Sequence, residues 1–155
     1  MHTIRLRGPW QLEALQRYVA HSLGGFVSQA ADVSSQVRSQ MPADWCETMG
    51  QDFLGVVRYR RKFNRPTNLS AERVWLVVEP PRSCGLVRVN GQVLGYVRFG
   101  APPGRFDITP LLNDHNSVEI DVEHPELDDA GHAPDDGTVY VTGGLVGEVR
   151  LEIEE

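Results

Sequence analysis

The chain has 155 residues and a formal net charge of −6 at pH 7. That length suits one domain with a substantial hydrophobic core, so we expect residues 1–155 to form a single domain. The acidic charge excludes nucleic acid and anionic membranes as expected partners. No apolar run approaches the roughly 20 residues of a spanning helix, and the first ten residues lack the apolar stretch of a secretory signal, so we expect a cytoplasmic protein.

The N-terminal part is open to two interpretations. Leu12, Leu15 and Val19 have helical spacing, whereas Gly8, Trp10 and Leu12 alternate as in a strand. No helix-capping residue precedes Trp10. Residues 22–40 are rich in Ser, Gln and Gly, and we expect a surface segment there with at most one edge strand.

Alternation with a period of two dominates the chain after residue 50. Asn90 and Gly91 predict a two-residue turn of a β-hairpin, because both residues readily adopt positive φ. Residues 138–141, TVYV, are interpreted as a further short β-run. Short strands separated by Gly and Pro predict an antiparallel sandwich or barrel. The residues expected to face its core are Val74, Leu76 and Val78, then Val118, Ile120 and Val122, then Val149, Leu151 and Ile153.

Eight segments follow one another in an informative order. They are LRGPWQL (6–12), MPADW (41–45), VRYRRKFNRP (57–66), VWLVVE (74–79), VRVNGQVLG (87–95), FDITPLL (106–112), NSVEIDV (116–122) and GGLVGEVRL (143–151). Together they make the chain resemble the N-terminal sugar-binding domain of glycoside hydrolase family 2 enzymes, such as β-galactosidases and β-glucuronidases. The resemblance implies an all-β fold, an antiparallel β-sandwich of the galactose-binding-like jelly-roll type, and it favours extended structure over residues 4–19.

The same resemblance bears on function. The catalytic glutamates of those enzymes lie on a separate (β/α) barrel further along the chain, so we expect no catalytic residue here. The resemblance implies a non-catalytic carbohydrate-binding-like module with weak or accessory glycan recognition through its end loops. The alternative is a structural or protein-interaction sandwich that has lost sugar binding and serves a separately encoded glycosidase as an accessory. Exposed edge strands and an arginine-bearing face also allow a homodimer.

A loop near the hairpin offers candidate sugar-binding residues. Aromatic rings can stack on a pyranose while arginines bond its hydroxyls, and such residues gather in the Gly- and Pro-rich segment 95–106. The candidates are Tyr96, Arg98, Phe99 and Arg105. The alternative interpretation is a loop that only closes one end of the sandwich. The three tryptophans, Trp10, Trp45 and Trp75, are expected in the core.

The segment from His124 to Gly137 is dense in carboxylates and imidazoles. The resemblance implies an acidic residue in this region that contacts substrate, and we name Asp135 and Asp136 as ligand-binding candidates. Oxygen-rich loops also bind Ca²⁺, for which Asp128, Asp129 and His132 are the candidate ligands. No other cofactor is expected, and a solvated loop is the alternative.

Two further expectations concern single side chains. Alternation places Arg61 on the core face with Tyr59 and Phe63, where an unpaired guanidinium is costly. We expect Asp107 to pair with it, and Glu148 as second choice. Arg58, Arg60 and Lys62 then lie on the outer face. Cys46 and Cys84 fit no zinc pattern, and we expect two buried free thiols, as free cysteine is usually buried, with a single disulfide as the alternative.

Overall fold

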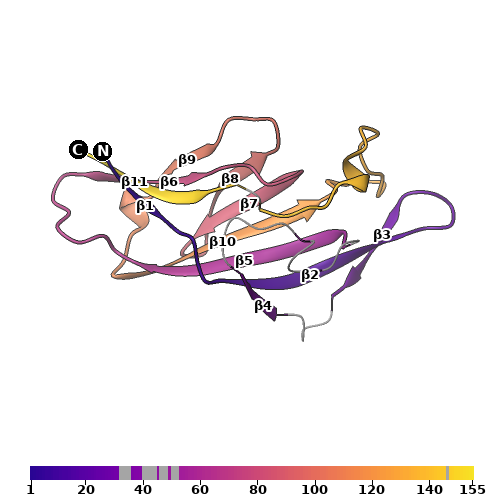
Figure 1. The fold of residues 1–155 in the computed structure, drawn as a ribbon, viewed down its shortest axis with the longest axis horizontal. Helices are drawn as coiled ribbons and strands as arrows, with labels where there is room; N and C mark the ends of the chain where they lie inside the picture. The colour runs from indigo at the N-terminus through magenta and orange to yellow at the C-terminus, as the bar shows by residue number, and fades with distance from the viewer. Residues whose placement is uncertain (32–35, 40–44, 46–48, 50–52, 146) are drawn as a thin grey trace.

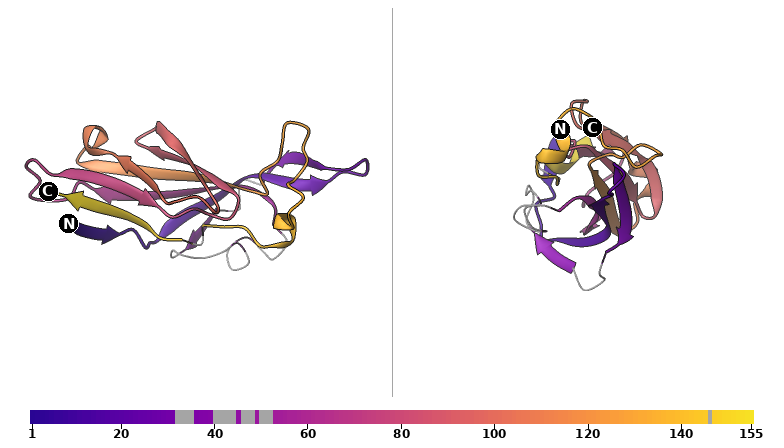
Figure 2. Two further views of the ribbon diagram at one scale, coloured as in Figure 1. Left: turned by 90° about the horizontal axis from the view of Figure 1, so that it is seen from above. Right: turned by 90° about the vertical axis from the view of Figure 1, so that its right-hand side faces the viewer.

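The computed structural model describes residues 1–31, 36–39, 45, 49, 53–145 and 147–155. Two antiparallel sheets lie face to face and form a sandwich that is not closed into a barrel (Figures 1 and 2). The predicted all-β jelly-roll sandwich is therefore confirmed. No helix in the described ranges is long and apolar enough to cross a membrane.

The smaller sheet carries both chain ends. Its order is β1 (His2–Arg5), β11 (Val149–Glu154), β6 (Arg73–Val78) and β9 (Gly104–Asp107). Strands β1 and β11 pair antiparallel with His2 opposite Ile153, so the two termini lie side by side (Figure 1). The chain then crosses through residues 6–9 from β1 to the other sheet.

The larger sheet has the order β3 (Phe26–Ala30), β2 (Trp10–Ala20), β5 (Gly55–Asn64), β10 (His115–His124), β7 (Cys84–Val89) and β8 (Gln92–Arg98). Strand β4 (Gln36–Ser39) also pairs with β2. The expectation of extended structure over residues 4–19 is confirmed. The expectation of at most one edge strand in residues 22–40 is wrong, because β3 pairs with residues 16–20 of β2 and β4 with residues 10–13. The sequence did not predict both strands because an edge strand buries few side chains and therefore has few apolar positions.

Two short 3₁₀ helices interrupt the strands, η1 (Thr109–Leu111) and η2 (Thr138–Tyr140). The β-run expected at residues 138–141 is therefore wrong. The carboxylate of Asp136 accepts the backbone N–H of Thr138 at 2.9 Å, and Gly137 has φ 83°. This local turn chemistry overrides the β propensity of the Thr, Val and Tyr side chains.

The core lies between the sheets and follows the predicted alternation. The inward side chains of β6, β10 and β11 that we predicted are buried, except that Ile153 is only partly so. Trp10 and Trp45 are buried as expected, and each indole N–H has an acceptor: Leu6 O at 2.6 Å and Tyr59 Oη at 2.9 Å. Cys84 is buried and free as expected, whereas Cys46 lies outside the described residues.

The hairpin between β7 and β8 has the predicted turn. Asn90 has φ 52° and Gly91 has φ 81°, the positive pair of a type I′ turn. The Asn90 side chain also ties the turn to β10, because its Oδ1 accepts the N–H of Ser117 at 2.9 Å. The local sequence thus sets both the turn and the register of β8.

Candidate functional site

The exposed rim of strand β8 holds three of the candidate sugar-binding residues. Tyr96 is 59% exposed and Phe99 is 68% exposed. Tyr96 pairs with Leu86 of β7 in a position that points away from the core, and Phe99 follows the strand where its N–H bonds the carbonyl of Ser83. We call Tyr96, Arg98 and Phe99 the β8 rim.

Arg98 lies between the Tyr96 ring and the loop after β10. Its guanidinium carbon lies 5.1 Å from the Tyr96 ring centroid, and its Nη2 donates to Glu126 at 3.1 Å. The hydrogen bond to Glu126 is the main reason that the pKa of Arg98 is raised. The β8 rim therefore presents an aromatic face next to a fixed cationic donor.

Arg105 does not join this rim. It pairs with Val77 on β6, on the outer face of the smaller sheet, whereas the β8 rim faces outward from the larger sheet. Its guanidinium lies 3.9 Å from the Trp75 ring centroid and bonds Glu154 at 2.8 Å. Arg105 thus covers Trp75, which is half-buried.

The two aspartates named as ligand candidates lie on the loop after β10, at the end of the sandwich where that loop contacts β3 (Figure 2). One carboxylate oxygen of Asp136 accepts hydrogen bonds from Thr138, and this hydrogen bonding lowers the pKa of Asp136. Asp135 is exposed. Neither has a described interaction with the β8 rim, so the sequence candidates do not converge on one site.

The three metal-ligand candidates form a turn instead of a cage. Asp128 Oδ1 accepts the backbone N–H groups of Ala130 and His132, both at 2.9 Å, and the latter bond is the main cause of its lowered pKa. His132 Nδ1 lies 3.8 Å from the same oxygen, and Asp129 is exposed. Within the described ranges no three His, Cys, Asp or Glu side chains are grouped so as to hold a metal. A Ca²⁺ site here stays a prediction.

His124, at the start of that loop, belongs to the core. It is fully buried, its Nδ1 lies 2.7 Å from the hydroxyl of Ser83, and its Nε2 lies 2.7 Å from the carbonyl of Val141. Burial lowers the pKa of His124. A neutral ring that donates from Nε2 and accepts at Nδ1 satisfies both contacts.

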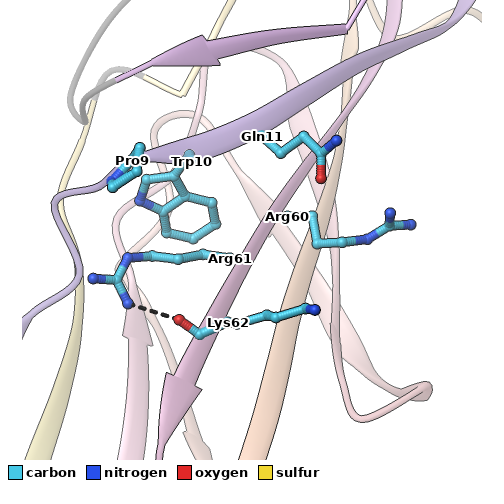
Figure 3. Close-up of a pocket in the computed structure, with 6 residues that line it drawn as sticks. All are labelled: Pro9, Trp10, Gln11, Arg60, Arg61 and Lys62. Atoms are coloured by element: carbon cyan, nitrogen blue, oxygen red, sulfur yellow. Dashed lines mark hydrogen bonds between the residues drawn. The ribbon is translucent and has the colours of Figure 1, made fainter.

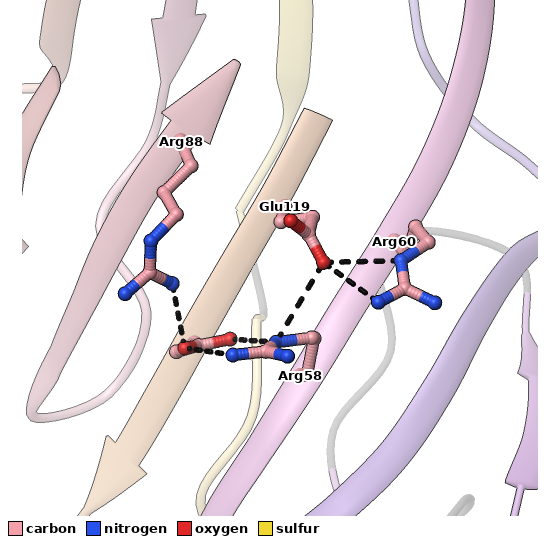
Figure 4. A network of polar contacts seen from close by, with 5 residues as sticks. Arg58, Arg60, Arg88 and Glu119 are labelled. Carbon is pink, nitrogen blue, oxygen red and sulfur yellow. Dashed lines mark hydrogen bonds and ion pairs between the residues drawn. The ribbon is translucent and has the colours of Figure 1, made fainter. Parts of the chain in front are cut away.

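The outer face of the larger sheet carries a closed network of charges (Figure 4). Arg58 grips Asp121 through Nε at 2.8 Å and Nη2 at 3.0 Å, and Arg88 donates to the same carboxylate at 2.9 Å. Arg60 donates to Glu119 at 2.8 Å. Burial alone would raise the pKa of Asp121, but the hydrogen bonds from the arginines outweigh it and lower this pKa. The outward arginines, as expected from alternation, are thus neutralised within the sheet.

Arg61 lies on the core side of β5, between buried Tyr59 and Phe63, as predicted, but both predicted partners are wrong. Asp107 pairs with Arg73 at 2.6 Å and Glu148 with Arg5 at 2.9 Å. The antiparallel register of the smaller sheet, β1 with β11 and β6 with β9, brings these charges together, whereas Arg61 lies in the other sheet.

Two cavities of about 370 Å³ each flank Arg61. The first is lined by Pro9, Trp10, Gln11, Arg60, Arg61 and Lys62 (Figure 3), and the second by Ile4, Arg5, Leu6, Arg61, Lys62, Phe63, Asn64 and Leu151. The sequence did signal an inward arginine, but it did not reveal these hollows, which arise where the chain crosses between the sheets.

Cys84 has no features of a nucleophile. Burial, followed by the charges of Glu126 and Glu123, raises the pKa of its thiol to about 12. A catalytic thiol requires the opposite shift.

No family model and no curated protein matches the chain. Solved structures do. A FMN-binding β-glucuronidase from Faecalibacterium prausnitzii is 26% identical, with a TM-score of 0.65, over 97% of this chain and 22% of its own. A Bacteroides uniformis β-glucuronidase is 21% identical, with a TM-score of 0.69, over 98% of this chain and 18% of its own. An uncultured Clostridium β-glucuronidase is 16% identical, with a TM-score of 0.72, over 99% and 29%.

The chain therefore spans less than a third of the length of these glucuronidases and matches them over nearly all of its own length. Likenesses of such low identity concern the fold, and a fold by itself does not assign an activity. In its fold the chain resembles the N-terminal sugar-binding domain of glycoside hydrolase family 2 enzymes, as the order of its sequence segments indicated.

Proposed function

We propose that the protein is a non-catalytic carbohydrate-binding-like module that recognises glycans weakly through the β8 rim. The observation that carries this proposal is that two exposed aromatic side chains, Tyr96 and Phe99, flank Arg98 in the sequence, with the Tyr96 ring beneath the Arg98 guanidinium. Exposed aromatic rings are costly to leave in water, and a sugar ring offers an apolar face to cover them.

The arrangement of Arg98 supports a binding role. Its ion pair with Glu126 and its position over the Tyr96 ring restrict its conformations before any ligand arrives. A preordered donor loses less entropy on binding than a free side chain does. Because the rim is open to solvent on one side, we expect dissociation constants of about a millimolar.

The carboxylates support a role without catalysis. Glycoside hydrolysis by two carboxyl groups needs one whose pKa is raised so that it can act as an acid. The described carboxyl groups with clearly shifted pKa values are all shifted downward by hydrogen bonds: Glu72, Asp107, Asp121, Asp128 and Asp136.

The test is titration of the protein with β-galactosides and β-glucuronides, followed by calorimetry and NMR. We expect weak, saturable binding that Tyr96→Ala and Phe99→Ala abolish. Tyr140→Ala is the matched control, because Tyr140 is also exposed, at 90%, but lies on η2. Micromolar binding that survives Tyr96→Ala would refute the rim as the site.

A second candidate function is a structural or protein-interaction sandwich, accessory to a separate glycosidase chain. The observation that favours it is the pair of edge strands of the larger sheet, β3 and β8, which carry exposed apolar side chains such as Val27 and Val93. In a homodimer, the same surfaces would contact a second copy of the chain. Sedimentation velocity distinguishes these cases: a concentration-dependent dimer favours self-association, whereas glycan binding by a monomer favours the first proposal.

A further inference from the structure

Arg61 stands at the place where the two layers of the sandwich are joined. The pairing of β2 with β5 begins at Gln11 and Arg60, so β2 does not pair with β5 beyond Arg60 on that side. The chain there leaves β2 through Pro9 and crosses to β1 of the smaller sheet. This crossing creates the two cavities that share Arg61 and Lys62 in their walls.

The guanidinium of Arg61 is only partly used by the protein. Nη1 donates to the carbonyl of Lys62 at 3.0 Å, while Nε is shielded from solvent and has no acceptor. No ion pair joins Arg61 to a carboxylate anywhere in the described part of the chain. Burial lowers the pKa of Arg61.

Another arginine of this protein shows which group the Nε and Nη2 side of a guanidinium binds. Arg58 uses its Nε and Nη2 together to hold the two carboxylate oxygens of Asp121, at 2.8 and 3.0 Å. This side-on, two-bond geometry suits a planar carboxylate and is among the stronger hydrogen-bonded pairs in proteins. In Arg61 the Nε of the same side of the guanidinium has no hydrogen-bond acceptor.

We propose that the cavities beside Arg61 form a binding site for a small organic carboxylate of about monosaccharide size, held by the Nε and Nη2 edge of Arg61. A volume of about 370 Å³ lies at the lower end of the range of small-ligand pockets. The site is separate from the β8 rim and does not depend on glycan binding there.

The walls of the cavities fit an anion. Among the described residues, no aspartate or glutamate lines either cavity, although the protein carries a net charge of −6. Lys62 lines both cavities as well, but its ammonium group points away from Arg61 (Figure 3), so Arg61 is the cation that faces the ligand, and Asn64 adds an amide group that can bond hydroxyls. Figure 3 shows Arg61 extending from β5 on the side opposite to Arg60 and Lys62, beside the Trp10 indole.

A purely structural role makes a different prediction. An arginine whose stem covers the core while its head reaches for water has no preference among small solutes. A ligand site requires the guanidinium to turn about its last side-chain bonds until Nε meets the carboxylate. The Nε–H group itself is therefore the probe that separates the two roles.

The experiment is NMR of the full chain with arginine labelled at ¹⁵Nε, titrated with galacturonate, galactose and inorganic phosphate in parallel. We expect galacturonate to shift the Arg61 Nε–H signal saturably, with a dissociation constant of about a millimolar. Galactose, which has no carboxylate, should leave that signal unmoved. Arg61→Lys should weaken galacturonate binding at least about tenfold, because lysine cannot form the two-bond fork.

Matched variants keep the result interpretable. Arg58→Lys, at an outward position of the same strand that is not among the described lining residues of either cavity, should retain the Arg61 response, and Tyr96→Ala should retain it even if glycan binding at the rim is lost. The proposal is overturned if the Arg61 signal does not move by about 50 mM galacturonate, if galactose moves it equally, or if phosphate alone moves it. The wild-type titration decides this even if a variant fails to fold.

Discussion

Replacing Asp121 with alanine should destabilise the outer face of the larger sheet. The substitution removes the acceptor of three charged hydrogen bonds, two from Arg58 and one from Arg88, with lengths of 2.8 to 3.0 Å. The side chains are 29% exposed in Arg58, 25% in Arg88 and 14% in Asp121. The network is thus neither a surface pair nor a fully buried one.

The expected loss follows from that intermediate exposure. An exposed ion pair contributes about 0.2 to 1 kcal/mol, whereas breaking a buried one costs about 3 to 5 kcal/mol. We therefore expect Asp121→Ala to lower the free energy of unfolding by about 2 kcal/mol. In a chain of this length, that corresponds to a fall of roughly 4 to 8 °C in the unfolding midpoint.

Urea unfolding at pH 7 measures the effect, with Asp114→Ala as the matched control because Asp114 is an exposed aspartate just before β10. The control should change stability by less than about 0.5 kcal/mol. The pKa of Asp121 is lowered in the folded state, so its contribution is complete above the unfolded value of about 3.9 and is lost as the pH falls through the folded value. The difference between wild type and Asp121→Ala should therefore shrink below about pH 4. A loss equal to that of the control, or an equal loss when Arg58 is already alanine, would refute the reasoning.

Three other outcomes are expected. Arg61→Met should change the free energy of unfolding by less than about 1 kcal/mol, because it keeps the aliphatic part of the side chain and removes a shielded N–H that has no acceptor. Arg61→Ala should lower the free energy of unfolding by about 2 kcal/mol. Equal effects of the two substitutions in urea unfolding would contradict this. The lowered pKa of His124 means that the unfolded chain takes up the proton first, so stability should be complete above about pH 6.5 and fall below it by at most about 1.4 kcal/mol per pH unit. His124→Gln should remove this slope between about pH 6.5 and 5, as thermal unfolding would reveal. Millimolar Ca²⁺ tests the predicted cation site at Asp128, Asp129 and His132: binding there should raise the unfolding midpoint and Asp128→Asn should abolish the rise, whereas an unchanged midpoint would exclude the site.

The candidate sites show the limit of pattern reasoning. Tyr96 and Phe99 were expected to be exposed, and they are, because a Gly- and Pro-rich segment at the end of a hairpin has little to pack against. Arg105 was grouped with them because it is near in sequence. The strand that contains it lies in the other sheet, so nearness along the chain did not mean nearness in space.

The sequence by itself determined the local features of this protein. Period-two alternation identified the inward faces of β6, β10 and β11, and Asn90-Gly91 identified the turn of the β7–β8 hairpin. These features depend on the pleat of a strand and on the φ preferences of single residues, which neighbouring letters reveal.

Only the tertiary structure decided how the charges pair. Alternation correctly predicted that Arg61 faces inward. The register between β9 and β6, however, pairs Asp107 with Arg73 instead. The cavities beside Arg61 lie where the pairing of β2 with β5 ends. Register and sheet membership join residues far apart along the chain, and they are fixed by the packing of the whole sandwich. A residue's direction is therefore local information, whereas its partner is not.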